Sequence, residues 1–204
     1  MSHTITLTSL AMMAFAANSV LCRLALGNGH IDAASFATIR VVAGAFILAV
    51  IVLLRSSGKV PRDADWRSAL ALYLYMVFFA FAYLTLAAGT GALILFGAVQ
   101  LTMFITALRS GERFSPVSWA GLTLAIAGLV YLVSPGLAAP DPVGAMLMAI
   151  AGIAWGAYSL VGRSAPEPTR ATAWNFLLSV PLVLMTSAVF IDDMDVSRTG
   201  IVLA

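Results

Sequence analysis

The stretch Gly89–Gly136 decides the fold and reads GTGALILFGAVQLTMFITALRSGERFSPVSWAGLTLAIAGLVYLVSPG. It contains two long apolar runs, Ala92–Leu108 and Pro116–Val133, and neither run carries a charged residue. The short turn Arg109–Arg113 separates them and holds two arginines and a glutamate. Uncharged runs of this length match a bilayer whose hydrocarbon layer is about 30 Å thick. The stretch therefore predicts a membrane hairpin of two helices.

The composition of the whole chain also favours a membrane environment. Of its 204 residues, 61% are hydrophobic and 10% are charged. Globular proteins contain roughly 25% charged residues, so this supply of charge is too small to cover the surface of a soluble fold. The lipid bilayer is therefore the first partner that we expect.

Motifs for catalysis, metal binding and nucleic-acid binding are missing from the sequence. The single Cys22 lies in the first apolar run, which gives neither a disulfide framework nor a Cys/His metal spacing. No serine-hydrolase elbow, zinc-protease motif or phosphate-binding glycine loop occurs. The eleven Lys and Arg residues are concentrated in a few loops, which is typical of membrane orientation. We expect no enzymatic activity, no cofactor, no metal and no nucleic-acid partner.

Apolar segments recur along the chain and predict an all-α, polytopic helical membrane protein with about seven transmembrane helices. They cover residues 5–26, 35–54, 68–88, 91–108, 116–133, 143–162 and 171–191. The last residues, Gly200–Ala204, look like the first turn of an eighth helix. The first segment has no basic region before it and is longer than the apolar core of a signal peptide, so we expect it to be retained.

The loops between these segments alternate in charge. The loops after the second, fourth and sixth segments are basic and contain Arg55, Lys59, Arg62, Arg67, Arg109, Arg113, Arg163 and Arg170. The other loops contain mainly acidic residues, among them Asp32 and Asp141. Basic loops stay on the cytoplasmic side of a membrane. The sequence therefore predicts a multi-pass protein of the cell inner membrane with a cytoplasmic N-terminus.

A faint internal repeat links the first and sixth segments. A shift of 140 residues places Leu10–Arg23 on Ile150–Arg163, and Phe15 then falls on Trp155. Five segments separate the two copies, and because this number is odd, the second copy is upside down relative to the first. Inverted repeats are a recurrent construction in secondary transporters.

A series of short motifs runs through the opening stretch. A glycine-rich entry is followed by a membrane helix, the turn Gly111-Glu112-Arg113, the pair Trp119-x-Gly121 and a helix that ends in Gly128-Leu-Val. This order resembles the end of an EamA repeat of the drug/metabolite transporter superfamily. The resemblance implies five helices per repeat and ten per chain. It divides this chain into a first repeat, residues 1–136, and an incomplete second repeat, residues 141–204, with two helices and the start of a third.

Small residues in two segments predict contacts between helices. The fifth segment carries Gly121, Ala125 and Gly128 on one face, and the sixth carries Gly152 and Gly156. Helices in lipid associate closely where small side chains let their backbones approach. These five residues therefore predict packing surfaces, and an alternative is that they let a helix rock against its neighbour.

Charged residues inside the predicted helices need a reason, because a charge at mid-bilayer costs about 2.5–3.5 kcal/mol on insertion scales. Three roles are open for Arg40: it meets an anionic or zwitterionic substrate, it pairs with another group of the protein, or it snorkels to the outer headgroups. Arg23, near the end of the first helix, is interpreted as an interface anchor. Glu112 is assigned to the structure of its turn. No segment contains Asp or Glu at depth.

Amides and aromatic residues complete the candidate substrate pathway. Amides occur in three different segments, where they line a cavity or form hydrogen bonds between helices. Aromatic residues of the third and sixth segments are candidates for cavity walls, with lipid-facing positions as the alternative. The candidate pathway residues are Arg40, Asn18, Gln100, Trp155, Tyr158, Asn175 and Tyr83.

Together these features predict a membrane transporter that moves a small polar or amphipathic metabolite by alternating access. The outward direction and the substrate class are implied by the resemblance. An alternative stays open, in which the chain is a truncated, transport-incompetent homologue or a membrane interaction subunit that requires a partner chain. A homodimer would supply such a partner.

Overall fold

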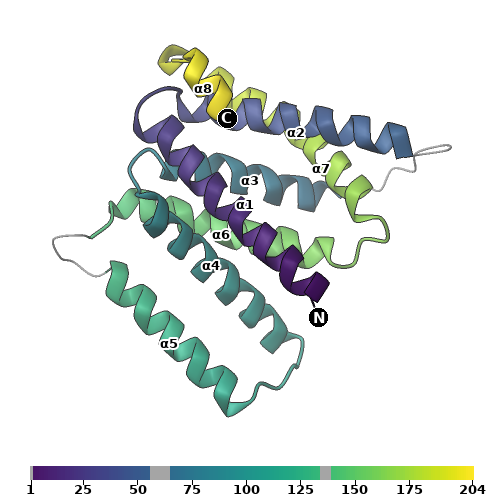
Figure 1. Cartoon of the computed structure of the whole chain (residues 1–204), viewed down its shortest axis with the longest axis vertical. Helices are drawn as coiled ribbons and strands as arrows, with labels where there is room; N and C mark the ends of the chain where they lie inside the picture. The colour runs from purple at the N-terminus through teal and green to yellow at the C-terminus, as the bar shows by residue number, and fades with distance from the viewer. Residues whose placement is uncertain (1, 56–64, 134–138) are drawn as a thin grey trace.

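The computed structural model of the chain describes residues 2–55, 65–133 and 139–204, with side chains from Thr4 onward except at 129, 132 and 133. Its helices are α1 (Ser2–Gly27), α2 (Ala33–Arg55), α3 (Trp66–Ala82), α4 (Ala88–Arg109), α5 (Pro116–Val133), α6 (Pro142–Gly162), α7 (Pro168–Val189), the short 3-10 helix η1 (Ile191–Asp193) and α8 (Arg198–Leu203) (Figure 1). Every predicted apolar segment forms a helix, so the predicted all-α class is confirmed. Lys59, Arg62 and the repeat boundary at Gly136 lie outside the described residues.

The lengths of these helices suit a membrane. Within the described residues, α1, α2, α4, α6 and α7 are each long and apolar enough to cross a bilayer. Helix α3, with 17 residues, is about 25 Å long at 1.5 Å per residue, a little short of the hydrocarbon thickness. Helix α5 is also apolar but shorter than the five spans. The chain is thus a multi-pass helical membrane protein.

Local sequence signals fix where several helices begin and end. Asp141 accepts a hydrogen bond from the Gly144 backbone N–H at 2.6 Å and caps α6, whose first residue is Pro142. Gly111 has a positive φ of 82° in the turn between α4 and α5, a conformation that glycine adopts without steric cost. The third predicted segment, 68–88, is too long: α3 ends at Ala82 because the chain turns there before α4 begins.

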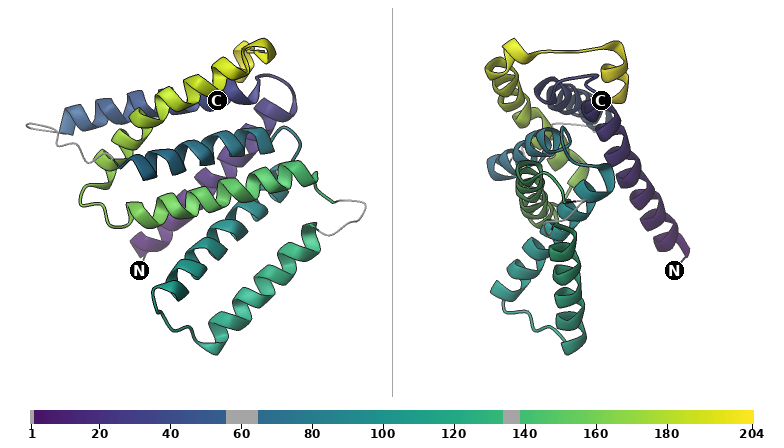
Figure 2. Two further views of the ribbon diagram at one scale, coloured as in Figure 1. Left: turned by 180° about the vertical axis from the view of Figure 1, so that it is seen from behind. Right: turned by 90° about the vertical axis from the view of Figure 1, so that its left-hand side faces the viewer.

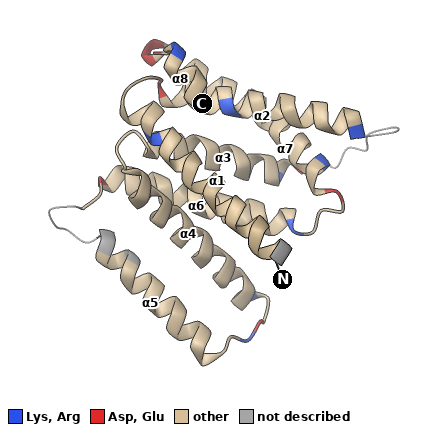
Figure 3. Ribbon diagram, in the orientation of Figure 1, with Lys and Arg blue, Asp and Glu red and all other residues tan. Residues whose placement is uncertain are grey.

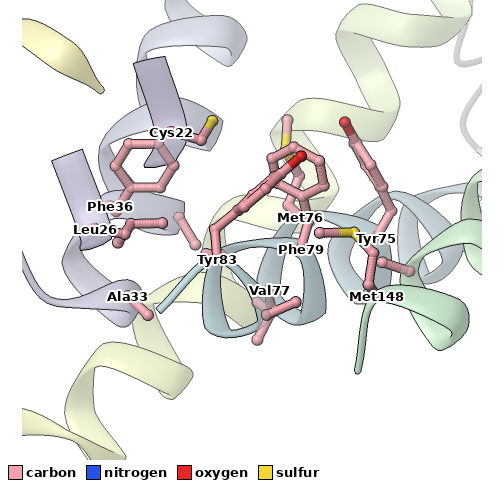
Figure 4. Packing of buried hydrophobic residues seen from close by; sticks show 14 of the residues in the cluster. Cys22, Leu26, Ala33, Phe36, Tyr75, Met76, Val77, Phe79, Tyr83 and Met148 are labelled. Carbon is pink, nitrogen blue, oxygen red and sulfur yellow. The ribbon is translucent and has the colours of Figure 1, made fainter. Parts of the chain in front are cut away.

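The helices pack around α3. Helix α3 contacts α6, α7 and α2, while α4 packs on α6 and α2 on α7. Helix α5 lies at the edge beside α4, and α1 crosses the bundle to reach α4 and α8 (Figures 1 and 2). The buried core follows one side of α3, where Tyr75, Phe79 and Tyr83 lie in a row, with Phe36 of α2 and Met148 of α6 against it (Figure 4).

The two ends of the bundle differ in charge. The N-terminus and the C-terminal ends of α2, α4 and α6 lie at one end, which contains Arg55, Arg109 and Arg163 (Figures 1 and 3). The loops at the other end carry Asp32 and Asp141. Helices α1 and α6 run in opposite directions (Figure 2), as an inverted copy requires. The division into repeats itself stays a prediction.

The predicted packing glycines differ in their surroundings. A Cβ at Gly152 would lie 2.6 Å from the Cβ of Ala98 on α4, and a Cβ at Gly156 would lie 2.9 Å from Thr102. These two glycines therefore allow close contact between α6 and α4. On α5, by contrast, Gly121 and Gly128 face open space among the described residues, and Ala125 is exposed. The small face of α5 is turned away from its neighbour α4, so the packing predicted for it is not found within the described chain.

Candidate functional site

A cavity of about 510 Å³ lies between five helices near the middle of the bundle. It is lined by Ala11, Ala14, Phe15, Asn18, Arg40, Leu72, Tyr75, Met76, Trp155, Tyr158, Thr172 and Phe176. These residues come from α1, α2, α3, α6 and α7. Phe15 and Tyr75 are close to the midpoints of α1 and α3, which places the cavity at mid-depth of a bilayer.

Arg40 is the charged residue of this cavity. Its Nη2 donates to the Asn18 side-chain oxygen at 2.7 Å, and its Nη1 lies 3.1 Å from the Cys22 sulfur. The guanidinium carbon is also 5.4 Å from the centre of the Phe36 ring and 5.8 Å from that of Phe79, positions typical of cation–π contact. The guanidinium therefore points into the protein and does not snorkel toward the headgroups.

The charge of Arg40 has no carboxylate beside it among the described residues. None of the helices α1 to α7 contains an Asp or Glu, and the hydrogen bonds of the guanidinium go to neutral groups. A guanidinium presents five N–H donors, more than these two partners occupy. The structure thus leaves a positive charge with spare donors at the cavity wall.

Aromatic rings form much of the remaining wall. The Trp155 ring lies 4.7 Å from the Tyr75 ring and 5.5 Å from the Tyr158 ring, measured between centroids. The Tyr158 hydroxyl donates to Thr172 Oγ1 at 3.4 Å. The Tyr75 hydroxyl points away from the core residue Met148 (Figure 4). This wall offers flat apolar surfaces with hydroxyl groups at their edges.

Matched positions of the two predicted repeat copies meet in this cavity. The shift of 140 residues relates Phe15 to Trp155 and Asn18 to Tyr158, and all four side chains line the cavity. The cavity is therefore lined by positions of α1 and α6 that the predicted repeat relates to each other, together with Arg40 of α2.

Three predicted pathway residues lie elsewhere. Gln100 lines a separate cavity of about 290 Å³ at the basic end, together with Glu112 and Arg163. Asn175 is buried, and its side-chain oxygen has no hydrogen-bond partner among the described residues. Tyr83 is fully buried because its ring packs against Gly91, and its hydroxyl donates to a backbone carbonyl. None of the three lines the central cavity.

Other cavity residues were not among the predicted ones. Thr172 and Phe176 of α7 and Leu72 and Met76 of α3 have no polar or motif signal that separates them from ordinary helix residues. Phe15 could have been found from the sequence, because the internal repeat aligns it with the predicted pathway residue Trp155. The repeat was therefore the best sequence guide to the cavity.

Arg23, interpreted as an interface anchor, has a different partner. Its Nη1 donates to the backbone carbonyls of Tyr83 at 3.0 Å and Leu84 at 2.9 Å. These carbonyls lie just after the end of α3, where the helix no longer supplies them with donors. Arg23 therefore ties α1 to the C-terminal end of α3.

A bundle of apolar helices around a mid-depth cavity that holds a polar group defines a multi-pass membrane protein. The sequence pattern of the EamA-like transporter family matches residues 3–134, and the chain belongs to this family. It is 43% identical over 202 residues to the uncharacterized protein PA1977 of Pseudomonas aeruginosa, a match that covers 99% of this chain and 70% of that protein. The family is one of transporters.

A protein of known crystal structure has a similar fold. The comparison gives a TM-score of 0.59 at 20% sequence identity, and it covers 96% of this chain and 79% of the other. At this identity the similarity concerns the fold alone.

Proposed function

We propose that the chain moves a small polar or amphipathic metabolite across the membrane through the central cavity, by alternating access. One observation carries this proposal: a cavity with a charged group near the middle of the helices, lined by side chains of α1 and α6. Secondary transporters built from inverted repeats hold their substrates near the bilayer midplane, at the interface of the repeats. A charge retained at such a depth is costly and is typical of a transport pathway.

The contacts between helices support a division into moving parts. The Thr38 hydroxyl of α2 lies 2.7 Å from that of Ser187 on α7 and donates to the Val183 carbonyl at 3.1 Å. Ser179 of α7 donates to the Ala69 carbonyl of α3 at 3.0 Å. These bonds join α2, α3 and α7, so we expect the three helices to move as one body. Helix α1 is held to this body by the Arg40–Asn18 and Arg23–Tyr83 hydrogen bonds, so a movement of α1 relative to it requires these bonds to break. The cavity lies between α1, α6 and this body.

The distribution of charge supports the orientation. The basic end of the bundle would face the cytoplasm of a cell with an inner membrane, with the N-terminus on the same side, because basic loops are retained there. The outward direction of transport follows only from the resemblance to exporters and is part of the proposal.

Blocking the cavity tests this function. Purified full-length chain is placed in liposomes loaded with an aqueous extract of small bacterial metabolites, and mass spectrometry identifies those that leave. Ala14→Trp puts a bulky ring into the cavity, whereas Met13→Trp, at a residue that is 69% exposed on the same helix, is the matched control. We expect efflux from the parent and from Met13→Trp, and none from Ala14→Trp. Equal efflux from both variants would contradict a route through this cavity.

The second candidate function, a subunit that requires a partner chain, is favoured by the α5 face. Gly121 and Gly128 on this face have open space around them among the described residues, and small residues are typical of helix interfaces in lipid. A second copy of the chain packed there would form a homodimer. The mass of the protein in detergent distinguishes the two candidates when it is measured together with efflux: a monomer without efflux supports the second candidate, and efflux from a dimer supports the first.

A further inference from the structure

We propose that the ligand of the central cavity is an amphipathic monoanion, a carboxylate attached to an apolar and preferably aromatic body, with no ammonium group. This inference rests on the proposed function of the cavity and specifies its substrate class. It follows from the sign of the charge at Arg40, from the lack of a carboxylate among the described lining residues, and from the aromatic rings of the lining.

The sign of the charge comes from Arg40. Its two hydrogen-bond partners, the Asn18 oxygen and the Cys22 sulfur, are neutral acceptors. Both are on α1, so they hold the guanidinium from one side and orient it within the cavity wall. The planar guanidinium matches a carboxylate with two parallel N–H···O bonds. A ligand carboxylate therefore supplies the counter-charge that α1 to α7 do not contain.

The missing groups disfavour an amine. No Asp or Glu is among the residues that line the cavity, and its ionisable groups besides Arg40 are the phenols of Tyr75 and Tyr158. A ligand ammonium would find no carboxylate among the described lining residues, and Arg40 would repel it, so contact with the aromatic faces is the favourable interaction left to it. Burying an unpaired charge is unfavourable. A zwitterionic amino acid pays this cost for its ammonium, whereas a plain carboxylate does not.

The aromatic lining of the cavity determines the body of the ligand. The rings of Phe15, Tyr75, Trp155, Tyr158 and Phe176 all line the cavity, together with Leu72 and Met76. Rings in this arrangement favour stacked or edge-to-face contact with another flat apolar group. A single arginine neutralises a single negative charge, so a dianion such as a phosphate monoester or a dicarboxylate would keep one charge unpaired. The cavity volume of about 510 Å³ is within the usual range for a small organic ligand.

Three probes with one common body test this inference. Hydrocinnamate carries a carboxylate, phenylalanine adds an ammonium, and phenethylamine carries an ammonium alone. Their binding to the purified full-length chain in detergent is measured by titration calorimetry, without any need for transport. We expect hydrocinnamate to bind at least about tenfold more tightly than either of the others, because only its charge is matched in the cavity.

Variants of the charged side test the role of Arg40. Arg40→Lys keeps the charge but not the two-pronged donor geometry, and we expect hydrocinnamate binding to weaken about tenfold. Arg40→Met removes the charge and should abolish binding. Asn18→Asp keeps the arginine but gives it a carboxylate within the chain, so it should also abolish binding, and it provides the test if Arg40→Met does not fold. Arg109→Met, at the basic end and outside the cavity, is the control and should bind as the parent does.

The outcomes separate this inference from the proposed function. Equal or tighter binding of phenylalanine or phenethylamine overturns it, as does hydrocinnamate binding that survives Asn18→Asp. A chain that exports metabolites from liposomes but binds none of the three probes also overturns it and leaves transport standing. If the chain binds hydrocinnamate in an Arg40-dependent way but supports no efflux, the monoanion site stands and the proposed transport is contradicted.

Discussion

Asn18 of α1 accepts a hydrogen bond of 2.7 Å from the guanidinium of Arg40 on α2. The bond crosses between two helices and joins a charged donor to a neutral amide in a mostly apolar setting. It therefore positions the arginine at the cavity wall without neutralising its charge. The proposed recognition of an anion depends on this combination.

Removing the amide should destabilise the protein as well as release the arginine. Hydrogen bonds to charged groups contribute about 1.5–3 kcal/mol, so Asn18→Ala is expected to lower the free energy of unfolding by an amount in that range. The measurement is reversible unfolding in mixed detergent micelles, with Asn28→Ala, at an exposed loop position, as the control. An Asn18→Ala protein as stable as the control would mean that the bond contributes nothing to the fold.

Two glycine-to-alanine substitutions test the helix contacts. Both replacements favour the helix by up to about 1 kcal/mol. At Gly152 the added methyl group meets the Leu95 backbone carbonyl and the Ala98 side chain at 2.6 Å, and overpacking of this kind costs about 1–3 kcal/mol. We expect Gly152→Ala to unfold more easily than the parent and Gly128→Ala, which faces open space among the described residues, to be at least as stable. The same change in stability for both variants would contradict the α4–α6 packing.

The helices could be predicted from the sequence because each one is an apolar run between charged loops. The apolar pattern does not determine how each helix is rotated about its own axis. Asn18, Gln100 and Asn175 carry similar amides at depth, yet only Asn18 faces the central cavity. Rotation is set by packing between helices, and packing depends on all the neighbours at once.

The glycines illustrate the same limit. Gly121 and Gly152 both lie in small-residue patterns, and the pattern alone predicts a contact for each. Only Gly152 has a neighbouring helix against it in the described chain. The hydrogen bond between Asn18 and Arg40 could not be predicted from the sequence either, since each residue had a plausible role without the other.

Arg23 should stabilise the junction between α1 and the end of α3. Its Nη1 donates to two backbone carbonyls, so Arg23→Ala removes charged donors and leaves those carbonyls without them. We expect a loss of about 1.5–3 kcal/mol in the free energy of unfolding. Arg163→Ala is the control, because the predicted repeat aligns Arg163 with Arg23. Arg163 is exposed at the basic end, so its removal should change stability much less. A larger effect at Arg163 would contradict the assigned role of Arg23.

Asp65, which lies before the membrane-spanning part of α3, makes a pH-dependent contribution. Its carboxylate accepts hydrogen bonds from the Ser68 hydroxyl and from the backbone N–H groups of Arg67 and Ser68. These bonds, that of the Ser68 hydroxyl first, lower the pKa of the Asp65 carboxyl below its ordinary value. A lowered pKa in the folded state stabilises the fold above the unfolded-state pKa of about 3.9, and this stabilisation is lost as the pH falls through the folded-state value.

The corresponding variants separate the charge from the cap. Asp65→Ala should cost about 1 kcal/mol of stability at neutral pH, as is usual for a lost N-cap, and the difference from the parent should shrink under acidic conditions. Asp65→Ser keeps a capping hydroxyl that does not titrate, so its difference from the parent should be smaller at neutral pH. Unfolding curves recorded over the acidic range provide the comparison, and a pH-independent difference for Asp65→Ala would exclude the carboxylate as its source.

The most direct measurement of the central claim is the reaction of single cysteines with a water-soluble maleimide, in a Cys22→Ser chain, which keeps an acceptor for Arg40 and has no other cysteine. Ala14→Cys places the thiol in the central cavity and Met13→Cys places it on the outer surface of the same helix. If the cavity is a water-filled substrate site, Ala14→Cys is labelled in membranes, excess hydrocinnamate slows the labelling, and Met13→Cys in the lipid is not labelled. Labelling of Met13→Cys with none at Ala14→Cys would contradict the account.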